Sequence, residues 1–418
     1  MSLRTRLAVF SGAPGLRAPN RTRNRVRGVC LALAVVALWP TSHGALAPAW
    51  VPALSPFVAT AVVLATRRLP APVWLGLIVG AAAILRRQVF CRWVCPAGLC
   101  LDGASWCGRR WGRRTPRFPL LGRSIVGLTL GGAFLGYPFL LWLDPLARFT
   151  GLFALGNRGA GLDLSAAGFL LLLLLSLLWP KVWCASLCPL GVLQDVLHSS
   201  ARTLRRVAAA SAHLPTVLTV RPWLSLRLGR SYPSRRVLLA VAAGAGCAAV
   251  ARSSYQDKAR PLRPPGALEE LTFRGVCTRC GNCVRACPSG IVAQDLGPNG
   301  WASLLTPVLH FRKDYCREDC VKCTEVCPSG ALTRVSREGK TSMRLGLPRV
   351  DMSVCRLGED RECSVCRSRC PYNVIRYVFS ETDYTLTPHL DREKCTGCGA
   401  CEAACPTAPR KAIVVLPT

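Results

Sequence analysis

Sixteen of the 24 cysteines lie in four groups in the last third of the chain. The first and last groups have the spacing C-x2-C-x2-C-x3-C, the second C-x3-C-x2-C-x3-C and the third C-x7-C-x2-C-x3-C, and Pro follows the final Cys of each. Three closely spaced thiolates plus a fourth before Pro are typical ligands of [4Fe–4S] clusters. The sequence therefore predicts four [4Fe–4S] clusters. Their ligands are Cys277, Cys280, Cys283 and Cys287; Cys316, Cys320, Cys323 and Cys327; Cys355, Cys363, Cys366 and Cys370; and Cys395, Cys398, Cys401 and Cys405.

Zinc sites and disulfides are the alternatives to clusters. Zinc usually takes two separated C-x2-C pairs, and disulfides do not require this periodicity. Where two clusters share a module, the Cys before Pro ligates the other cluster, so the groups must be paired. Pairing of the first group with the last and the second with the third is favoured because their spacings match. Pairing of neighbouring groups is the other option.

Two further cysteine pairs form an internal repeat, C-x3-C-P-x-G-x3-D. Its copies run from Cys91 to Asp102 and from Cys184 to Asp195, and each follows an apolar stretch. On a helix, C-x3-C spacing places both sulfurs on one face. We interpret Cys91, Cys95, Cys184 and Cys188 as a membrane redox site, which holds one further cluster or acts as a dithiol relay. The alternative is that they are small buried packing residues.

The elements that must position these cysteines include stretches long enough to cross a bilayer. Five stretches are expected to span the membrane: 28–46, 71–86, 122–143, 164–180 and 236–251. A sixth apolar stretch, 51–66, contains Pro52 and Pro56 and is expected to lie at the membrane interface or to enter the membrane and return on the same side.

The charge distribution predicts orientation. The net charge is +32, yet only four of the 22 acidic residues precede Arg252. Arginines cluster beside the apolar stretches, as they do at the cytoplasmic ends of membrane helices. This placement argues against nucleic-acid binding and favours the lipid bilayer as partner. It predicts a cytoplasmic N-terminus and, after five crossings, an extracytoplasmic C-terminus.

The segment Ser234–Leu239 reads S-R-R-V-L-L and is similar to the twin-arginine export signal. Clusters are built where iron and sulfide are supplied, so a cluster domain must cross the membrane already folded, which this route permits. The alternative is an ordinary positive flank of the last helix.

Together these features predict an all-α polytopic membrane domain followed by an α+β polyferredoxin domain built from two ferredoxin-like two-cluster modules. The expected divisions are a basic arm (1–27), a membrane domain (28–200), a basic cytoplasmic segment (201–235), a last membrane helix (236–251), a linker (252–270) and the polyferredoxin domain (271–418).

The first part, with its paired C-x3-C-P motifs, resembles the membrane iron–sulfur subunit of the quinol dehydrogenase of periplasmic nitrate reductase. The second part resembles the exported four-cluster polyferredoxin subunit of that system. In the membrane subunit of that system, a cytoplasmic two-cluster domain usually follows the membrane part. In this chain the polyferredoxin follows the membrane part instead. The residues that carry the likeness are 91–96, 184–189, 277–288, 316–332, 355–371 and 395–406.

The resemblance implies a multi-pass protein of the bacterial inner (cytoplasmic) membrane, an electron-transfer component of a quinol dehydrogenase. It would take electrons from the quinol pool and pass them through four [4Fe–4S] clusters to an extracytoplasmic reductase or carrier. The alternative is a maturation or regulatory membrane ferredoxin that reduces a metal or a thiol during assembly of another enzyme.

Overall fold

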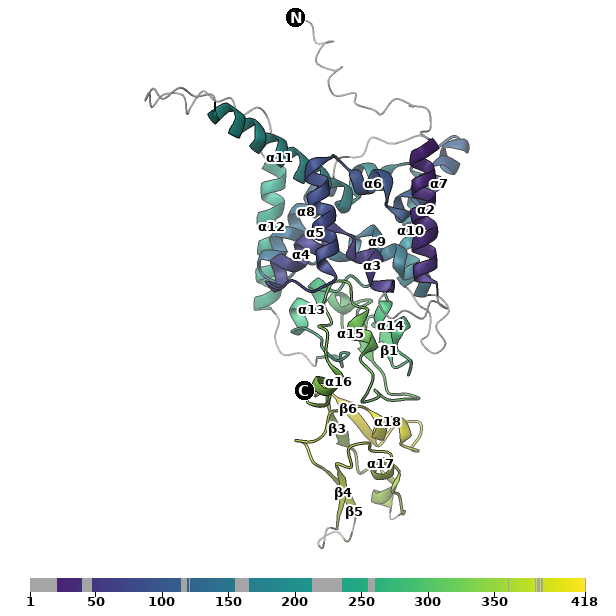
Figure 1. Ribbon diagram of the computed structural model, residues 1–418. Helices are drawn as coiled ribbons and strands as arrows, with labels where there is room; N and C mark the ends of the chain where they lie inside the picture. The colour runs from purple at the N-terminus through teal and green to yellow at the C-terminus, as the bar shows by residue number, and fades with distance from the viewer. Residues whose placement is uncertain are drawn as a thin grey trace, which may run out of the picture.

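The structure is a computed structural model in two parts, a layer of helices and a tapering domain of small strands and helices attached to one side of it (Figure 1). It describes residues 21–39, 47–113, 119, 121–154, 165–212, 235–254, 260–359, 361–379, 381, 384 and 386–417.

The N-terminal part is helical throughout its described residues. The Cys-Pro motifs and Asp144-Pro145 begin helices, because Pro is favoured in the first helical turn. The elements are α2 (Arg21–Leu38), α3 (Ala47–Ala53), α4 (Pro56–Thr66), α5 (Val73–Leu85), α6 (Val89–Trp93), α7 (Pro96–Arg110), α8 (Leu121–Phe134), η1 (Leu141–Leu143), α9 (Pro145–Gly151), η2 (Leu152–Ala154), α10 (Ser165–Leu178), η3 (Trp183–Leu187), α11 (Pro189–Ala212) and α12 (Arg235–Ser253).

The apolar helices are mostly shorter than the expected spans. Among the described residues only α12 is long and apolar enough to cross a membrane, while α4, α5, α8 and the apolar part of α10 have between 10 and 17 residues. The stretch 122–143 is not one helix. It breaks after Phe134, because Gly136 adopts a left-handed conformation (φ 83°) and Pro138 follows. A multi-pass topology is therefore not shown by helix length.

The doubtful stretch 51–66 is divided between two helices. The first ends at Ala53, and Ser55 caps α4, where its hydroxyl accepts a hydrogen bond from Val58 N at 3.3 Å. The flanks of this segment both reach the C-terminal domain: Leu38 O accepts a hydrogen bond from Arg285 at 3.0 Å, and Pro70 packs against Gly330. Leu38 and Pro70, which lie on either side of this stretch in the sequence, are thus both beside the C-terminal domain.

The C-terminal domain is α+β, with three two-stranded antiparallel sheets in its described residues: β1–β2, β3–β6 and β4–β5. Its elements are α13 (Glu270–Val276), α14 (Asn282–Ala286), β1 (Val292–Gln294), η4 (Trp301–Ser303), β2 (Pro307–Leu309), α15 (Lys322–Glu325), α16 (Arg337–Thr341), β3 (Leu347–Val350), η5 (Arg356–Glu359), α17 (Val365–Ser368), β4 (Ile375–Phe379), β5 (Leu386–Leu390), α18 (Ala400–Ala404) and β6 (Ile413–Leu416).

Two expected boundaries differ from the structure. Helix α11 continues to Ala212, across the expected division at residue 200. The second half of the expected linker belongs to the C-terminal domain. There buried Arg263 donates to the Glu270 carboxylate at 2.5 and 2.9 Å and lies over the Phe273 ring. A buried charge needs such pairing, so this end of the linker is part of the core.

Candidate iron–sulfur sites

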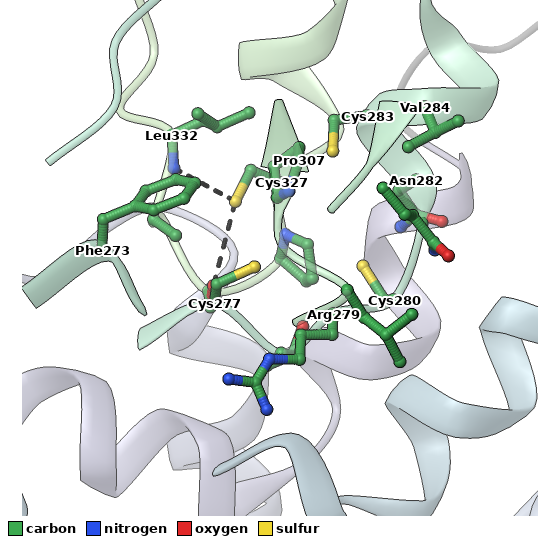
Figure 2. Close-up of a pocket in the computed structure, with 17 residues that line it drawn as sticks. Phe273, Cys277, Arg279, Cys280, Asn282, Cys283, Val284, Pro307, Cys327 and Leu332 are labelled. Atoms are coloured by element: carbon green, nitrogen blue, oxygen red, sulfur yellow. Dashed lines mark hydrogen bonds between the residues drawn. The ribbon is translucent and has the colours of Figure 1, made fainter. Parts of the chain in front are cut away.

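Figure 2 shows the first cavity, into which sulfurs from two cysteine groups point. Cys277, Cys280 and Cys283 line it together with Cys327, the Cys before Pro in the second group. The favoured pairing of the first group with the last is therefore wrong, and the neighbouring groups share a module. The prediction from matching spacings failed because the two cysteine groups of one module can have loops of different length.

The second site is the reciprocal one. Cys287 of the first group lies close enough to interact electrostatically with Cys316 and Cys323, and Cys323 also with Cys320. The buried ammonium of Lys340 donates to the backbone oxygens of Arg317 and, at 2.7 Å, Cys320. It therefore places a positive charge beside these thiols and fixes their loop.

The distal module repeats this exchange. One cavity is lined by three cysteines of the third group and Cys405, the other by three cysteines of the fourth group and Cys370. All sixteen predicted ligands thus fall into four sets of four. The distal sets are Cys355, Cys363, Cys366 and Cys405, and Cys370, Cys395, Cys398 and Cys401.

Glycine makes the loops of the two regular groups possible. Gly281 (φ 74°) and Gly399 (φ 84°) follow the second Cys and begin the short helices α14 and α18 that carry the third. Both have left-handed backbone that side chains disfavour. At Gly399 a Cβ would also lie 2.1 Å from the ring of Phe311. The sequence C-x2-C-G is therefore a structural requirement of the site.

Each set offers the four cysteine thiols that a [4Fe–4S] cluster takes as ligands. Burial raises the pKa of Cys277 to about 12 and that of Cys398 to about 11, so these thiols need a metal to lose their protons. Leu332 N donates to Cys327 Sγ at 3.4 Å, a contact typical of cluster cradles.

The two modules meet at their cysteine loops. Cys316 N donates to Cys398 O at 2.9 Å, and Leu345 N donates to Thr396 O at 2.8 Å. The Cys316 set therefore adjoins the Cys398 set. Arg148 of the helical layer contacts the Cys277 loop, and the Cys316 set adjoins the Cys398 set, so these three sets follow one another away from the layer. Helix α17, which carries Cys366, lies farther from the helical layer than α18 (Figure 1).

The helical part brings the repeated cysteines together. Cys91 lies within electrostatic range of Cys95, Cys184 and Cys188, although 93 residues separate the copies. Gly98 N donates to Cys95 Sγ at 3.3 Å, and Gly191 N donates to the Cys188 thiol in the same way. Cys95 and Cys188 are buried, whereas Cys184 is exposed. The two copies therefore form one site with approximate internal symmetry.

The last residue of each repeat binds an arginine. Asp102 pairs with Arg27 of α2 at 2.8 Å, and Asp195 pairs with Arg87 at 2.7 Å. These pairs hold the helices that follow each C-P motif. Buried Gln194, which precedes the second Asp, donates to Cys91 Sγ at 3.1 Å.

Sequence reasoning missed the buried helix α9, which lies between this site and the first cavity. At its start, Asp144 accepts hydrogen bonds from Leu146 N and from Ser55 Oγ at 2.9 and 2.5 Å, and it lies in electrostatic range of Cys95. One turn later, buried Arg148 donates to the backbone oxygens of the Cys277 loop. The available signal was that Asp144 is one of four acidic residues in the first 251 and precedes Pro.

Comparison with protein families matches three regions. Residues 276–332 and 361–408 match two families of 4Fe-4S dicluster domain, one in each module. Residues 68–114 and 164–206, which contain both C-x3-C-P motifs, match a 4Fe-4S binding domain. No solved structure matches the chain.

Comparison with curated proteins finds ferredoxin-type relatives. The methylamine utilization ferredoxin-type protein MauM of Methylobacillus flagellatus is 35% identical over 195 residues, which cover 44% of this chain and 80% of that protein. The ferredoxin-type protein NapG of Escherichia coli is 35% identical over 196 residues, 44% of this chain and 83% of that protein. The chain therefore belongs to the family of ferredoxin-type 4Fe-4S electron-transfer proteins that includes NapG and MauM.

Proposed function

We propose that the protein is a multi-pass inner-membrane component of a quinol dehydrogenase, which passes electrons from the quinol pool through four [4Fe–4S] clusters to an extracytoplasmic reductase or carrier. When bound, each cluster supplies one-electron redox chemistry. The observation that carries the proposal is the continuous series of cysteine sites, from the repeat in the helical layer to the tip of the C-terminal domain. A storage or structural protein would not need this order.

Outward-facing apolar side chains support a membrane location for more helices than α12. On α2, Val29, Leu33 and Val36 are between 59% and 67% exposed and share one face. On α5, Ile78 and Leu85 are 63% and 70% exposed. An exposed apolar stripe of this kind is costly in water and favourable in lipid. Several short helices would then share the layer, with the bilayer thinned around them and flanking arginines extended to its surface.

The C-x3-C-P site is the proposed entry point for electrons. Its four thiols converge, and the matched 4Fe-4S binding domain contains all of them. They would hold a fifth cluster or act as a dithiol relay. Helix α9 then joins this site to the first cavity, because Asp144 at its start lies in electrostatic range of Cys95 and Arg148 one turn later donates to the loop between Cys277 and Cys280. It is buried along its length, so it excludes water between the sites.

The test is anaerobic reduction of the purified, cluster-loaded chain in detergent by a short-chain quinol, followed by electron paramagnetic resonance. The original chain should gain reduced-cluster signals. The Cys184→Ser/Cys188→Ser variant should lose reduction by quinol but keep reduction by dithionite, because its sixteen C-terminal ligands are intact. Cys247→Ser is the matched control, since Cys247 is exposed and lies outside every site. Failure of the original chain to accept electrons from quinol would contradict the proposal.

A further inference from the structure

Two polar side chains occupy equivalent positions in the two modules. Gln294 on β1 and Tyr377 on β4 each lie seven residues after the Cys that precedes Pro in their group. Each is paired in its sheet with a proline, Gln294 with Pro307 and Tyr377 with Pro388. Pro307 lines the first cavity, and Pro388 lines the cavity of the third cysteine group. Directly paired residues share one face of a sheet, so both polar side chains lie on the face toward the cysteines.

In the distal module this side chain contacts a predicted ligand. The Tyr377 hydroxyl lies 3.6 Å from Cys366 Sγ. The Arg367 guanidinium lies 5.8 Å from the centre of the Tyr377 ring and helps to hold the ring there. A thiolate that binds iron carries no proton, so in the loaded site the hydroxyl is the donor and the sulfur is the acceptor.

In the first module the equivalent side chain is an amide without a protein partner. Gln294 Nε2 and Oε1 are both buried, and neither has a hydrogen-bond partner within the part of the chain that the structure describes. Gln294 nevertheless lines the first cavity, where the amide of Asn282 donates to Val326 O at 3.4 Å. Buried amides are nearly always hydrogen-bonded. A [4Fe–4S] cluster presents sulfur acceptors, for which the Gln294 amide is a matching donor.

We infer that Gln294 and Tyr377 are equivalent hydrogen-bond donors that set the reduction potentials of the clusters in their two sites. The Gln294 amide donates to a sulfur of the first cluster, and the Tyr377 hydroxyl donates to Cys366 Sγ. Reduction adds one electron to the cluster and so increases the negative charge on its sulfurs, while no proton is transferred. Each donor therefore favours the reduced form of its own cluster. Both roles rest on the proposed function only through the clusters themselves.

Each donor can be removed with little change of shape. Gln294→Leu and Tyr377→Phe are compared by a redox titration of the cluster-loaded full chain in detergent, with dithionite and mediators, followed by electron paramagnetic resonance. Each variant should lower one of the four midpoint potentials, and the two should lower different ones. At the original midpoint the ratio of reduced to oxidised cluster should fall roughly threefold to tenfold, the range for one lost hydrogen bond, and tenfold equals about 59 mV for a one-electron couple. The double variant should show both shifts.

The matched controls lie on the opposite faces of the same strands. Ala293→Ser and Val378→Thr change residues adjacent to the two donors, and they should leave all four potentials unchanged. Electron–nuclear double resonance of the reduced chain in H2O and D2O gives a second measurement. One exchangeable proton beside the affected cluster should be lost in each donor variant and kept in each control.

Four results would overturn the inference. They are unchanged potentials in both donor variants at full iron content, a shift in only one of them, equal shifts in the controls, or loss of the first cluster from both Gln294→Leu and Gln294→Met, which would make Gln294 a packing residue. A chain that shows the expected shifts yet is not reduced by quinol would refute the proposed quinol step. The two donors would then stand, because the titration uses dithionite.

Discussion

Replacement of Arg148 tests whether the helical layer and the first cysteine site act as one unit. Arg148 Nη2 donates to Thr278 O at 2.7 Å and to Arg279 O at 3.1 Å, inside the loop between Cys277 and Cys280. Arg148 is 4% and Thr278 2% exposed, so the bond between them is shielded from water, while the bond to Arg279 O is partly buried. The Arg148 guanidinium also lies 5.9 Å from the centre of the Trp142 ring, and Arg279 lies over the same ring at 5.5 Å.

The magnitude follows from these contacts. A hydrogen bond to a charged group contributes about 1.5–3 kcal/mol, so loss of one buried and one partly buried bond should cost roughly 3–5 kcal/mol in Arg148→Met. The positive charge also stabilises the extra electron of a reduced cluster. A unit charge acting over about 10 Å at an effective dielectric constant of about 20 contributes roughly 1.7 kcal/mol, or roughly 70 mV for a one-electron couple. Arg148→Met should lower one midpoint potential of the four by tens of millivolts.

The assay is a redox titration followed by electron paramagnetic resonance, together with heat-induced loss of the visible iron–sulfur absorption. Arg148→Lys keeps the charge, so it should retain most of the potential while losing part of the stability. Arg252→Met is the matched control, because exposed Arg252 donates to a single carbonyl, Leu135 O, at 3.3 Å. If Arg148→Met leaves all four potentials and the thermal stability unchanged, the coupling between the two parts is refuted.

Three further predictions concern clusters, ligands and sidedness. Four cubes require about sixteen irons per chain and a fifth about twenty, and iron and sulfide assays of anaerobically purified protein would exclude clusters if they found zinc instead. Cys287→Ser should damage the cluster held by Cys316, Cys320 and Cys323 and spare the cluster held by the other cysteines of its own group. Loss of the cluster held by Cys395, Cys398 and Cys401 instead would contradict the observed pairing. Arg235→Lys/Arg236→Lys keeps the positive flank of α12 but should reduce protease accessibility of the C-terminal domain in spheroplasts; equal accessibility of both chains would show that the arginines are only a flank.

The cysteine ligands were readable from the sequence because their spacing is local. Three thiols within one short loop must face one centre, so the sixteen predicted residues line or adjoin four sites in the structure. Pairing depends on contacts between groups, and these follow from chain path rather than spacing. The second group reaches the first through the turn at Gly330 and the bridge between Ala267 and Leu332. Nothing in the spacing of Cys316 to Cys327 encodes that contact.

The helical layer was predictable in composition but not in its internal contacts. Apolar stretches predicted helices, yet the break after Phe134 and the division at Ser55 shorten them. Because the helix ends there, residues 135–144 turn the chain, and Asp144 and Pro145 can begin α9 inside the layer. Arg148 could not be recognised from sequence, because an arginine near apolar residues usually marks a membrane flank. Its partners are backbone oxygens more than a hundred residues away.

The reciprocal exchange of cysteines has a consequence for how the modules work. Each set takes three thiols from one group and the fourth from its neighbour, so neither cluster site of a module can form without the loop of the other. The contact between Cys316 N and Cys398 O extends this dependence across the two modules, and Arg148 extends it to the helical layer. Loops held at both ends reorganise little on reduction, and rigid surroundings favour fast transfer between fixed sites. The same constraints that pair the cysteines therefore hold the four sites in a fixed series between the helical layer and the β4–β5 hairpin.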